Sequence, residues 1–424
     1  MIDIKFIREH PEKVKEAVRL KNMDVDIDAL LELDARLLDI QRELQEIRTE
    51  QNQAGKTIAR LQGEEKKSAI ENMSRLKERA KELADRQAQL EPEFHERMLR
   101  VPQIPSSDAA VGRSEEDNVE VRRVGDPPRF DFPLKDHVEL GELLDIIDLQ
   151  RGVKLAGSRN YILKGAGARL HQAVLRLAFD HMAEKGFTAM TVPVLVDERI
   201  MEGMGQFPLH RDESYLCERD GQALAGTSEV ALVGYHADEI LSADDLPKTY
   251  TALSTCFRRE AGAAGRDTRG LYRIHFFDKV EQVVLCREDA DEAARWHERI
   301  LANTEEMLAK LELPYRVVEV CTGDMGQGKV RMYDIETWMP SRESYGETHS
   351  ASSLHDFQAR RLNLRYRDAE GNVHFCYTLN NTVVASPRIL IPLLELNQNA
   401  DGSVNIPAAL QPYMGGMERI TPVS

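Results

Sequence analysis

The chain has 424 residues, of which 42% are hydrophobic and 30% are charged, and its net charge is −16 at pH 7. This composition is typical of a globular protein of two to three domains with an ample core, and the acidic balance argues against a generic nucleic-acid binder, so any nucleic-acid contact must come from a local patch. No apolar run is long enough to span a membrane, a secretory signal core is absent, and five scattered cysteines without a CxxC pair favour reduced thiols in a cytoplasm over a disulfide framework or a zinc site.

Two heptad repeats come first along the chain, separated by Gly63. The first repeat steps alternately by three and four through Leu30, Leu33, Leu37, Ile40, Leu44, Ile47, Gln51, Ala54, Ile58 and Leu61. The second runs through Ala69, Met73, Leu76, Ala80, Leu83, Gln87, Leu90 and Phe94. Apolar side chains at this spacing pair helices, so the pattern predicts two long helices folded back into an antiparallel coiled-coil hairpin.

The polar faces of this predicted hairpin are rich in basic residues mixed with glutamates. The basic residues are Arg42, Arg48, Lys56, Arg60, Lys66, Lys67, Arg75, Lys77, Arg79 and Lys81. A solvated coiled-coil surface explains each of them as well as a contact with nucleic acid does. A protruding arm that binds an RNA backbone is the second interpretation.

Composition changes after the hairpin. Residues 102–135 are rich in proline, serine, glycine and charge, which predicts a linker between an arm (1–101) and a globular domain (136–424). In that domain helical periods alternate with strand-like runs that follow one another without crossover helices. The predicted strands include 248–260, 271–286, 345–353, 361–368 and 373–380. The expected fold class is therefore α+β, an antiparallel sheet flanked by helices.

Two of these strands carry more charge than buried strands usually do. They are joined by the loop AGAAGRDTRG, residues 261–270. On the second strand one face holds Arg273, His275, Phe277, Lys279 and Glu281, while the other face is mostly apolar. A solvent-facing sheet with cross-strand salt bridges is one interpretation. The other is a polar floor that holds a triphosphate on arginines and an amine on a glutamate.

The motifs in and around this strand pair resemble those of a known family. FRREAGAAGRDTRGLYRIHFFDKVE (257–281) is similar to motif 2 of the class II aminoacyl-tRNA synthetases, in the form found in the seryl-tRNA synthetase family. GTSEV (226–230), ETHSASSLHDFQARR (347–361), TLNNTVVASPR (378–388) and GFTAMTVPVLV (186–196) resemble its serine-binding segment, its magnesium segment, motif 3 and motif 1. With the N-terminal hairpin, the resemblance covers essentially the whole chain.

The resemblance implies a role for each matching residue. Serine is expected to bind Thr227, Ser228, Glu229, Arg258, Glu281, Asn380 and Thr382, with its ammonium or hydroxyl on Glu281. ATP is expected to bind Arg258, Arg259, Glu260, Ile274, Phe277, Glu347, Thr348, His349, Ser350 and Arg388. The catalytic residues implied are Arg258, Arg388 and Glu347, and the residues implied to hold Mg²⁺ through ATP are Glu347 and Ser350.

Some features of these motifs need particular backbone geometry. Ser386 is expected to cap a helix whose first turn holds Arg388, but Pro392 predicts a kink or a later helix start. Glu347 and Ser350 are three residues apart, so they share a face only if their strand bulges or bends. Phe276 replaces the family's usual glutamine on the core face, which predicts altered packing rather than lost catalysis.

The activity implied is ATP-dependent activation of L-serine and its transfer to the 3′ end of tRNA(Ser), and of tRNA(Sec) as well. The arm would bind the tRNA, and the family resemblance implies a cytoplasmic homodimer. An amino acid:carrier-protein ligase is the nearest alternative, but such proteins lack the long arm. A coiled-coil adaptor with an inactive synthetase-like domain is a third, which the intact Arg258, Glu281, Glu347 and Arg388 argue against.

Overall fold

The structure is a computed structural model that describes residues 1–58, 60–263 and 269–423. Part of the predicted loop 261–270 therefore lies outside the described residues. The chain divides into two compact units. The hairpin unit consists of residues 2–19 and 23–102, and the sheet unit consists of residues 1, 20–22 and 103–424. Among the described residues, no helix combines the length and the apolar character needed to cross a membrane.

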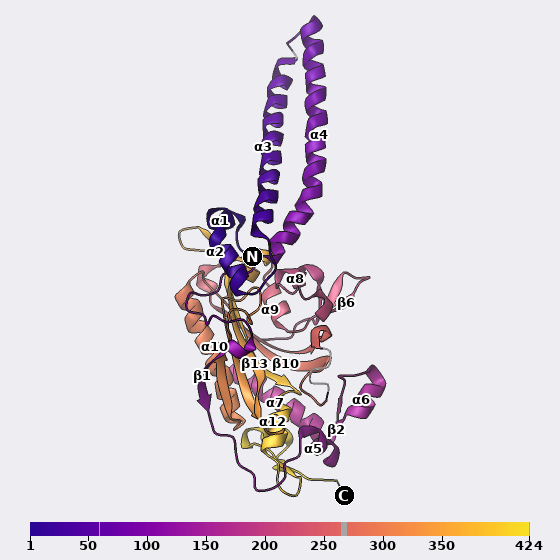
Figure 1. Cartoon of the computed structure of the whole chain (residues 1–424), viewed down its shortest axis with the longest axis vertical. Coiled ribbons are helices and arrows are strands. Elements are labelled where there is room, and N and C mark those ends of the chain that lie inside the picture. Colours follow the sequence, from indigo (N-terminus) through magenta and orange to yellow (C-terminus); the bar gives the residue numbers. More distant parts are fainter. Residues whose placement is uncertain (59, 264–268, 424) are drawn as a thin grey trace. The chain divides into compact units, whose positions relative to one another are not determined.

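The hairpin unit is built on two long helices, α3 (Ile27–Ile58) and α4 (Gly63–Arg100), which lie side by side in Figure 1. Every described heptad position is buried or half-buried, whereas most residues between these positions are exposed. Arg79 of α4 pairs with Glu43 of α3 at 2.7 Å, and Asn72 reaches Glu50 further along the pair, so the two helices run antiparallel. The predicted helix pairing is confirmed, with one correction: Gly63 begins α4 instead of lying in the turn.

Two short helices, α1 (Ile4–Glu9) and α2 (Pro11–Leu20), precede this pair. Arg8 of α1 donates two hydrogen bonds to the Asp34 carboxylate on α3, at 2.6 and 2.8 Å. Ile7 of α1 and Val14 of α2 are fully buried. The first turns of α3 are therefore part of a small helical core, and the remainder of α3 and α4 forms the hairpin proper.

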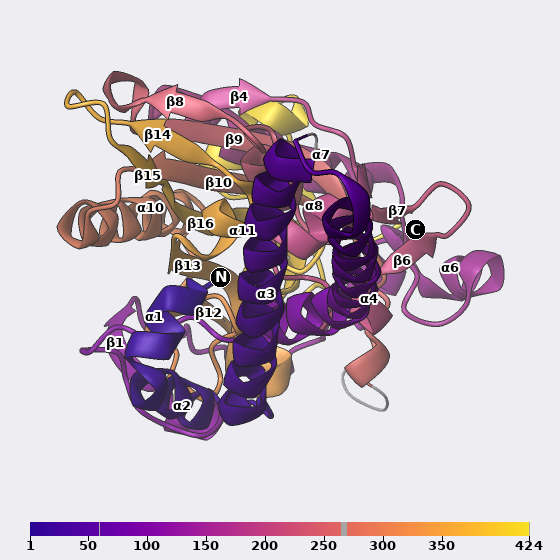
Figure 2. The same ribbon diagram turned by 90° about the horizontal axis from the view of Figure 1, so that it is seen from above.

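The sheet unit contains an eight-stranded sheet, in the order β1–β11–β12–β13–β16–β10–β9–β4, which can be followed across Figure 2. The strands are β1 (Val119–Val124), β4 (Thr188–Met190), β9 (Lys248–Phe257), β10 (Phe276–Cys286), β11 (Tyr315–Glu319), β12 (Arg331–Met339), β13 (Ser344–His355) and β16 (Tyr377–Ser386). All neighbours pair antiparallel except β4 and β9. The predicted fold class is thus confirmed.

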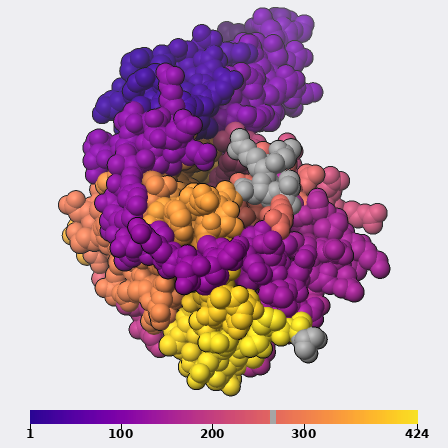
Figure 3. Space-filling view, turned by 60° about the horizontal axis from the view of Figure 1, so that its bottom comes forward, coloured from indigo at the N-terminus to yellow at the C-terminus, as the bar shows by residue number. Residues whose placement is uncertain are grey.

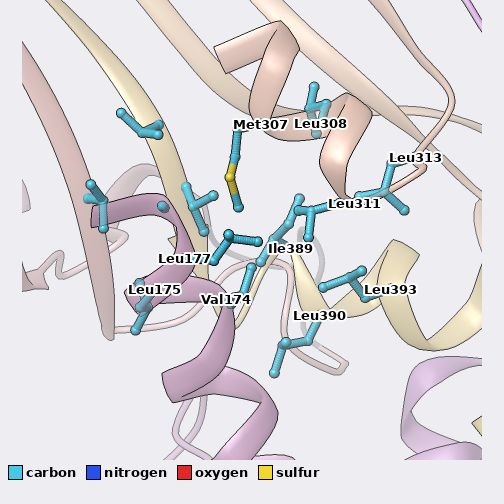
Figure 4. Packing of buried hydrophobic residues seen from close by; sticks show 14 of the residues in the cluster. Val174, Leu175, Leu177, Met307, Leu308, Leu311, Leu313, Ile389, Leu390 and Leu393 are labelled. Atoms are coloured by element: carbon cyan, nitrogen blue, oxygen red, sulfur yellow. The ribbon is translucent and has the colours of Figure 1, made fainter. Parts of the chain in front are cut away.

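Helices cover both faces of this sheet. The first face packs against α7 (Gly165–Glu184), α10 (Ala290–Lys310) and α12 (Leu390–Leu396). Figure 4 shows side chains of these three helices in the larger core, among them Val174, Met307 and Leu393. The second face carries the short helices α8 (Glu198–Gly203), α9 (Glu229–Gly234) and α11 (Phe357–Leu362), which build a second hydrophobic cluster.

Several sequence-based boundaries differ from the structure. The strand predicted at 271–286 begins only at Phe276, and the strand predicted at 248–260 ends at Phe257. The strand predicted at 373–380 is divided between β15 (Val373–Phe375) and the start of β16.

Residues 102–135 were expected to be a linker, but β1 lies within them and pairs with β11 at the edge of the sheet. In the space-filling view, purple atoms of the sheet unit run in a band beside the orange atoms (Figure 3). The strand predicted at 361–368 begins as helix α11, and only Arg365–Arg367 form a strand, β14. The strand Val119–Val124 reads VEVRRV and is mostly exposed, so its charged residues made it look like part of the linker.

Candidate active site

A cavity of about 880 Å³ lies in the sheet unit and is lined by residues of β9, β10, β13 and β16. This volume is within the range of small-molecule sites. The lining includes most of the residues expected to bind serine or ATP, namely Thr227, Glu229, Arg258, Glu260, Ile274, Phe277, Glu281, Glu347, Thr348, His349, Ser350, Asn380, Thr382 and Arg388. Residues that are up to 161 positions apart in the sequence are thus brought to one site.

A β-bulge in β13 explains how Glu347 and Ser350 both reach this cavity. Ile335 and Glu336 are consecutive on β12, but they pair with His349 and Glu347, so Thr348 is an extra residue on β13. The Thr348 hydroxyl donates to the carbonyl of Ile335 at 3.2 Å and is buried. The predicted break in strict alternation is confirmed, because residues 347–350 all line the cavity.

Arg388 approaches the cavity from a loop rather than from a helix. Helix α12 begins at Leu390, and Ser386 is the last residue of β16, so Ser386 does not cap a helix and Arg388 is not in its first turn. The later helix start inferred from Pro392 is correct: Pro392 lies in the first turn, where its missing N–H costs no intrahelical bond. The Arg388 guanidinium donates to the carbonyls of Tyr272, at 3.0 Å, and Glu347, at 3.2 Å.

The arginine-rich end of the cavity is defined by guanidinium groups that lie over aromatic rings. Arg388 and Arg342 lie over the ring of Tyr272, at 4.6 and 4.3 Å from its centroid. Arg258 lies over the ring of Phe277 at 5.3 Å. Cations at these distances are attracted by the ring faces. This arginine-rich end can bind the phosphates of a nucleotide, and the neighbouring rings can stack on its base.

The acidic end of the cavity is defined by two lining carboxylates, Glu281 and Glu229, which accept hydrogen bonds from Thr382 and Asn380 of β16. Glu281 is 1% exposed and pairs with Lys279, two residues earlier on β10, at 2.7 Å. The Thr382 hydroxyl donates to the same Glu281 oxygen at 3.4 Å. A buried pair of this kind is strained by loss of solvation, and a second positive group can compete for the carboxylate. Glu281 is therefore placed to accept a substrate ammonium in a water-poor site.

Glu229 is the second carboxylate of this acidic end. Its Oε1 accepts hydrogen bonds from Gln358, at 2.7 Å, and Asn380, at 2.9 Å. Burial raises the pKa of Glu229, and the nearby Glu281 carboxylate raises it further. Gln358 is itself held by the Thr378 hydroxyl at 2.6 Å. The chain thus orients Glu229 through two amide donors, and a positive ligand group would favour its charged form.

Three expected site residues are placed differently from the prediction. Arg259 donates to the Asp212 carbonyl at 3.2 Å, and it is not among the residues that line the cavity. Ser228 is 2% exposed, lies just before α9, and also does not line the cavity. Glu260 does line it, but its carboxylate pairs with Arg273 at 2.9 Å. Arg259 and Glu260 follow the end of β9 and Ser228 precedes α9, so strand alternation does not decide where these side chains point.

Sequence reasoning missed several residues that line the cavity or contact its lining residues. They include Arg342, Lys329, Glu336 and Gln358, which line it, and Asp334, which lies opposite Ser350 on β12. Gln358 is within the DFQARR segment, so the resemblance of that segment could have found it. Arg342 follows β12 in a short 3₁₀ turn, Pro340–Arg342, and no local pattern indicates where that turn lies in the sheet unit.

Oxygen donors suited to a divalent cation lie together on β12 and β13. Burial and the neighbouring Glu347 carboxylate raise the pKa of Asp334 well above its usual range, and its buried Oδ1 has no hydrogen-bond partner among the residues that the structure describes. Glu347 is half-exposed at the same place. Within residues 1–58, 60–263 and 269–423, no group of three or more His, Cys, Asp or Glu side chains forms a metal site. These residues fit Mg²⁺, which usually takes one or two carboxylates together with substrate phosphates.

Comparisons with known proteins agree on one group of relatives. Residues 1–105 match the seryl-tRNA synthetase N-terminal domain, and residues 215–397 match the class II tRNA synthetase core domain (G, H, P, S and T). A serine–tRNA ligase of Deinococcus radiodurans is 49% identical over 418 residues, covering 99% of this chain and 98% of the relative.

Two solved structures extend this similarity to the fold. Seryl-tRNA synthetase from Pyrococcus horikoshii complexed with ATP is 36% identical, with a TM-score of 0.92 over 100% of both chains. Cytoplasmic serine–tRNA ligase from Naegleria fowleri in complex with AMP is 29% identical, with a TM-score of 0.88 over 100% of this chain and 99% of that one.

Proposed function

Because this chain belongs to the seryl-tRNA synthetase family, we propose that it is a serine–tRNA ligase whose cavity joins L-serine to ATP and then passes the serine to the 3′ end of tRNA(Ser). One observation carries the assignment of the site. The lining of a single cavity combines the guanidinium groups of Arg258, Arg388 and Arg342 with the buried carboxylate of Glu281 and with the carboxylate of Glu229, which Gln358 and Asn380 orient. Guanidinium groups can bind the phosphates of a nucleotide triphosphate, and carboxylates can bind the ammonium group of an amino acid. One cavity with both kinds of group can therefore hold both substrates.

The first step is attack by the serine carboxylate on the α-phosphorus of ATP. A bond forms between the carboxylate oxygen and phosphorus, the bond to the bridging oxygen breaks, and pyrophosphate leaves. No side-chain nucleophile is required, so the protein contributes positioning and charge stabilisation. Arg258 and Arg388 hold the phosphates, and Phe277 stacks on the adenine. Magnesium supplies further charge neutralisation when bound, and Glu347 and Ser350, with Asp334 behind them, are the residues that would hold it.

The second step transfers serine from the adenylate to a ribose hydroxyl at the 3′ end of the tRNA, and AMP leaves. Glu281 is proposed to hold the serine ammonium, while Thr227, Glu229, Asn380 and Thr382 complete the amino-acid end. Serine is selected by hydrogen bonds to its hydroxyl, since an amino acid without that hydroxyl leaves buried polar groups unpaired. Threonine would be excluded by the close walls of this end.

The hairpin is proposed to bind the tRNA. Its outer half, residues 44–78, carries basic residues interspersed with glutamates, so side chains able to contact phosphate are present there on an acidic chain; the basic residues are Arg48, Lys56, Arg60, Lys66, Lys67, Arg75 and Lys77. Phosphate contacts of this kind are independent of base sequence. The same surface would accept tRNA(Sec) if that RNA shares the shape of tRNA(Ser). An amino acid:carrier-protein ligase has no use for such an arm, so α3 and α4 favour the tRNA ligase.

The protein is also proposed to be a cytoplasmic homodimer. The support is the motif 1 resemblance at residues 186–196, where β4 forms an edge of the sheet. Size-exclusion chromatography with light scattering tests the dimer, which should have twice the mass of the 48.1 kDa chain.

ATP–pyrophosphate exchange with a panel of amino acids tests the central proposal. Serine should support exchange in the absence of tRNA, and alanine, glycine and threonine should support it far less. Exchange without any preference for serine would overturn the substrate assignment. Exchange with serine but no charging of tRNA would favour the carrier-protein ligase.

A further inference from the structure

Glu281 and Thr382 face each other on neighbouring strands at a point where the strand ladder is irregular. Glu281 pairs with Thr382, but the preceding Val280 pairs with Val384, so Val383 is an extra residue on β16. A bulge of this kind disrupts the local backbone hydrogen bonds and aims side chains that regular pairing would place elsewhere. The two cavity-facing residues therefore need other contacts to fix their positions.

A buried threonine holds the backbone of Glu281 from one side. Thr251 lies on β9, is 0% exposed, and donates from its hydroxyl to the Glu281 carbonyl at 2.8 Å. Thr251 does not line the cavity. Its hydroxyl acts on Glu281 through the main chain, within a few bonds of the carboxylate.

A second buried threonine holds Thr382 from the other side. Thr304 of α10 is also 0% exposed, and its hydroxyl donates to the Thr382 carbonyl at 3.1 Å. The Thr304 hydroxyl oxygen also accepts hydrogen bonds from the side-chain amides of Asn381, at 3.0 Å, and Gln282, at 3.3 Å. A hydroxyl has one proton and two lone pairs, so this one is saturated and its direction is fixed.

The two side-chain amides that bind the Thr304 hydroxyl belong to residues directly next to Glu281 and Thr382 in the sequence. Gln282 follows Glu281, and Asn381 precedes Thr382, and both are 0% exposed. Each amide also donates to the Ile300 carbonyl of α10, at 2.9 and 2.7 Å. Helix α10 is thus hydrogen-bonded to both β10 and β16, next to the residues that form the amino-acid end of the cavity.

We propose that Thr251 and Thr304 are positioning residues that set the separation of Glu281 and Thr382. This separation fixes where the ammonium is held relative to the groups that bind the serine hydroxyl, and thereby the selection of serine over amino acids without that hydroxyl. The inference rests on the proposed function, since it takes this end of the cavity as the amino-acid site. Neither threonine touches substrate. Each acts through a hydrogen bond to a main-chain carbonyl. Both carbonyls lie at the bulge, where regular pairing of β10 and β16 does not fix the positions of Glu281 and Thr382.

Paired variants at both positions test this. Thr304→Val and Thr251→Val keep the shape and remove the hydroxyl, and Thr304→Ser and Thr251→Ser restore it. Thr337→Val is the matched control, because Thr337 is 0% exposed in β12 of the same sheet and its hydroxyl has no hydrogen-bond partner among the described residues. ATP–pyrophosphate exchange gives kcat and KM for serine and for ATP, with alanine and glycine as competing amino acids, and melting temperature is recorded for every variant.

Each valine variant should raise the serine KM by about tenfold, the effect of roughly one missing hydrogen bond, and narrow the preference for serine over alanine. The ATP KM should change far less, the serine variants should recover most of the loss, and Thr337→Val should leave both KM values unchanged. Equal changes in serine and ATP KM, or an altered melting temperature with unaltered selectivity, would show that the two hydroxyls serve folding only. A wild-type protein that shows no preference for serine would instead refute the proposed function, whatever the variants do.

Discussion

Arg388 shows how much of the site depends on the shape of one side chain. Its guanidinium contacts two carbonyls, those of Tyr272 and Glu347, and the ring of Tyr272 as well. The planar group can make these contacts and still present N–H groups to a phosphate. An ammonium group is a point charge and cannot keep that arrangement.

Arg388→Lys should therefore slow adenylate formation by about a hundredfold or more, the usual effect of removing one interaction with the transition state. The rate of pyrophosphate exchange at saturating serine and ATP measures it. Arg367→Lys is a suitable control, because Arg367 is exposed on β14, away from the cavity, and donates to the nearby Gly371 carbonyl. Near-normal exchange by the Arg388 variant would remove Arg388 from the phosphate site.

Glu281 and Lys279 form a buried pair, so a change at Glu281 has two consequences that need to be separated. Glu281→Gln should raise the serine KM much more than the ATP KM, because the ammonium loses its counter-charge. It should also lower the free energy of unfolding by about 3 kcal/mol, since Lys279 is left buried without its partner.

A double variant separates these two consequences. Lys279→Met combined with Glu281→Gln removes both charges, so stability should largely return while serine binding stays poor. Calorimetry and exchange kinetics are the two measurements. Recovery of serine binding in the double variant would mean that Glu281 serves only to neutralise Lys279.

At the scale of single elements, alternation along strands predicted which side chains of β10 face the cavity. Irregular strand pairing limited the accuracy of that prediction elsewhere. The polar face of β10 was predicted from the order of residues 273–281, and Phe277, Lys279 and Glu281 all line the cavity. The two bulges could not be placed from one sequence, because an extra residue only shows when its partner strand is known. The start of α12 was misplaced for a related reason: Ser386 and Pro387 look like a helix cap, but β16 continues through Ser386.

Phe276 tests the face assignment of β10. It stacks on Tyr161, with ring centroids 4.7 Å apart and planes 10° from parallel, and it does not line the cavity. Phe276→Gln should lower stability by about 2 kcal/mol through the missing stack and a poorly solvated amide, with little change in kcat. Phe277→Gln, on the neighbouring residue of the opposite face, should instead raise the ATP KM. A large fall in kcat for Phe276→Gln without a change in melting temperature would reverse the assignment.

At the scale of the whole molecule, the helical hairpin was the most predictable part, because its period is repeated many times. Heptad positions without a large apolar residue, such as Gln51 and Ala54, do not hide the pattern because most of the other positions hold one. The site was predicted through resemblance, since residues from β9, β10, β13 and β16 meet only in the folded sheet. Arg342 and Asp334 were missed because neither spacing nor local pattern links them to the motifs.

The division into two units allows the arm to be tested without disturbing the site. Replacing residues 44–78 by a short Gly/Ser loop keeps the helical core around Asp34 and leaves the Glu43–Arg79 pair at the new tip. Pyrophosphate exchange should be unaffected, because every lining residue of the cavity follows position 114. Charging of tRNA should fall steeply.

Salt dependence shows whether the outer hairpin binds tRNA through its phosphates. In the intact protein tRNA affinity should fall as salt rises, and in the shortened protein the slope should be shallower by about one for each phosphate that the hairpin no longer reaches. Circular dichroism confirms that the shortened chain is folded. Equal charging by both proteins would mean that the outer hairpin does not bind tRNA.

The bulge at Thr348 also bears on how this protein can change over evolutionary time. Because Thr348 is the extra residue of β13, the positions of Glu347 and Ser350 depend on how many residues the strand has, as well as on which residues they are. Thr348→Ala keeps that count and removes only a hydroxyl. Deleting Thr348 leaves Glu347 and Ser350 two positions apart, and regular alternation then keeps both side chains on one face of the strand. The same two side chains can therefore share a face either on a bulged strand with Thr348 or on a regular strand without it, so β13 should tolerate the loss of this residue, which a library of single-residue deletions would reveal and a library of substitutions would not.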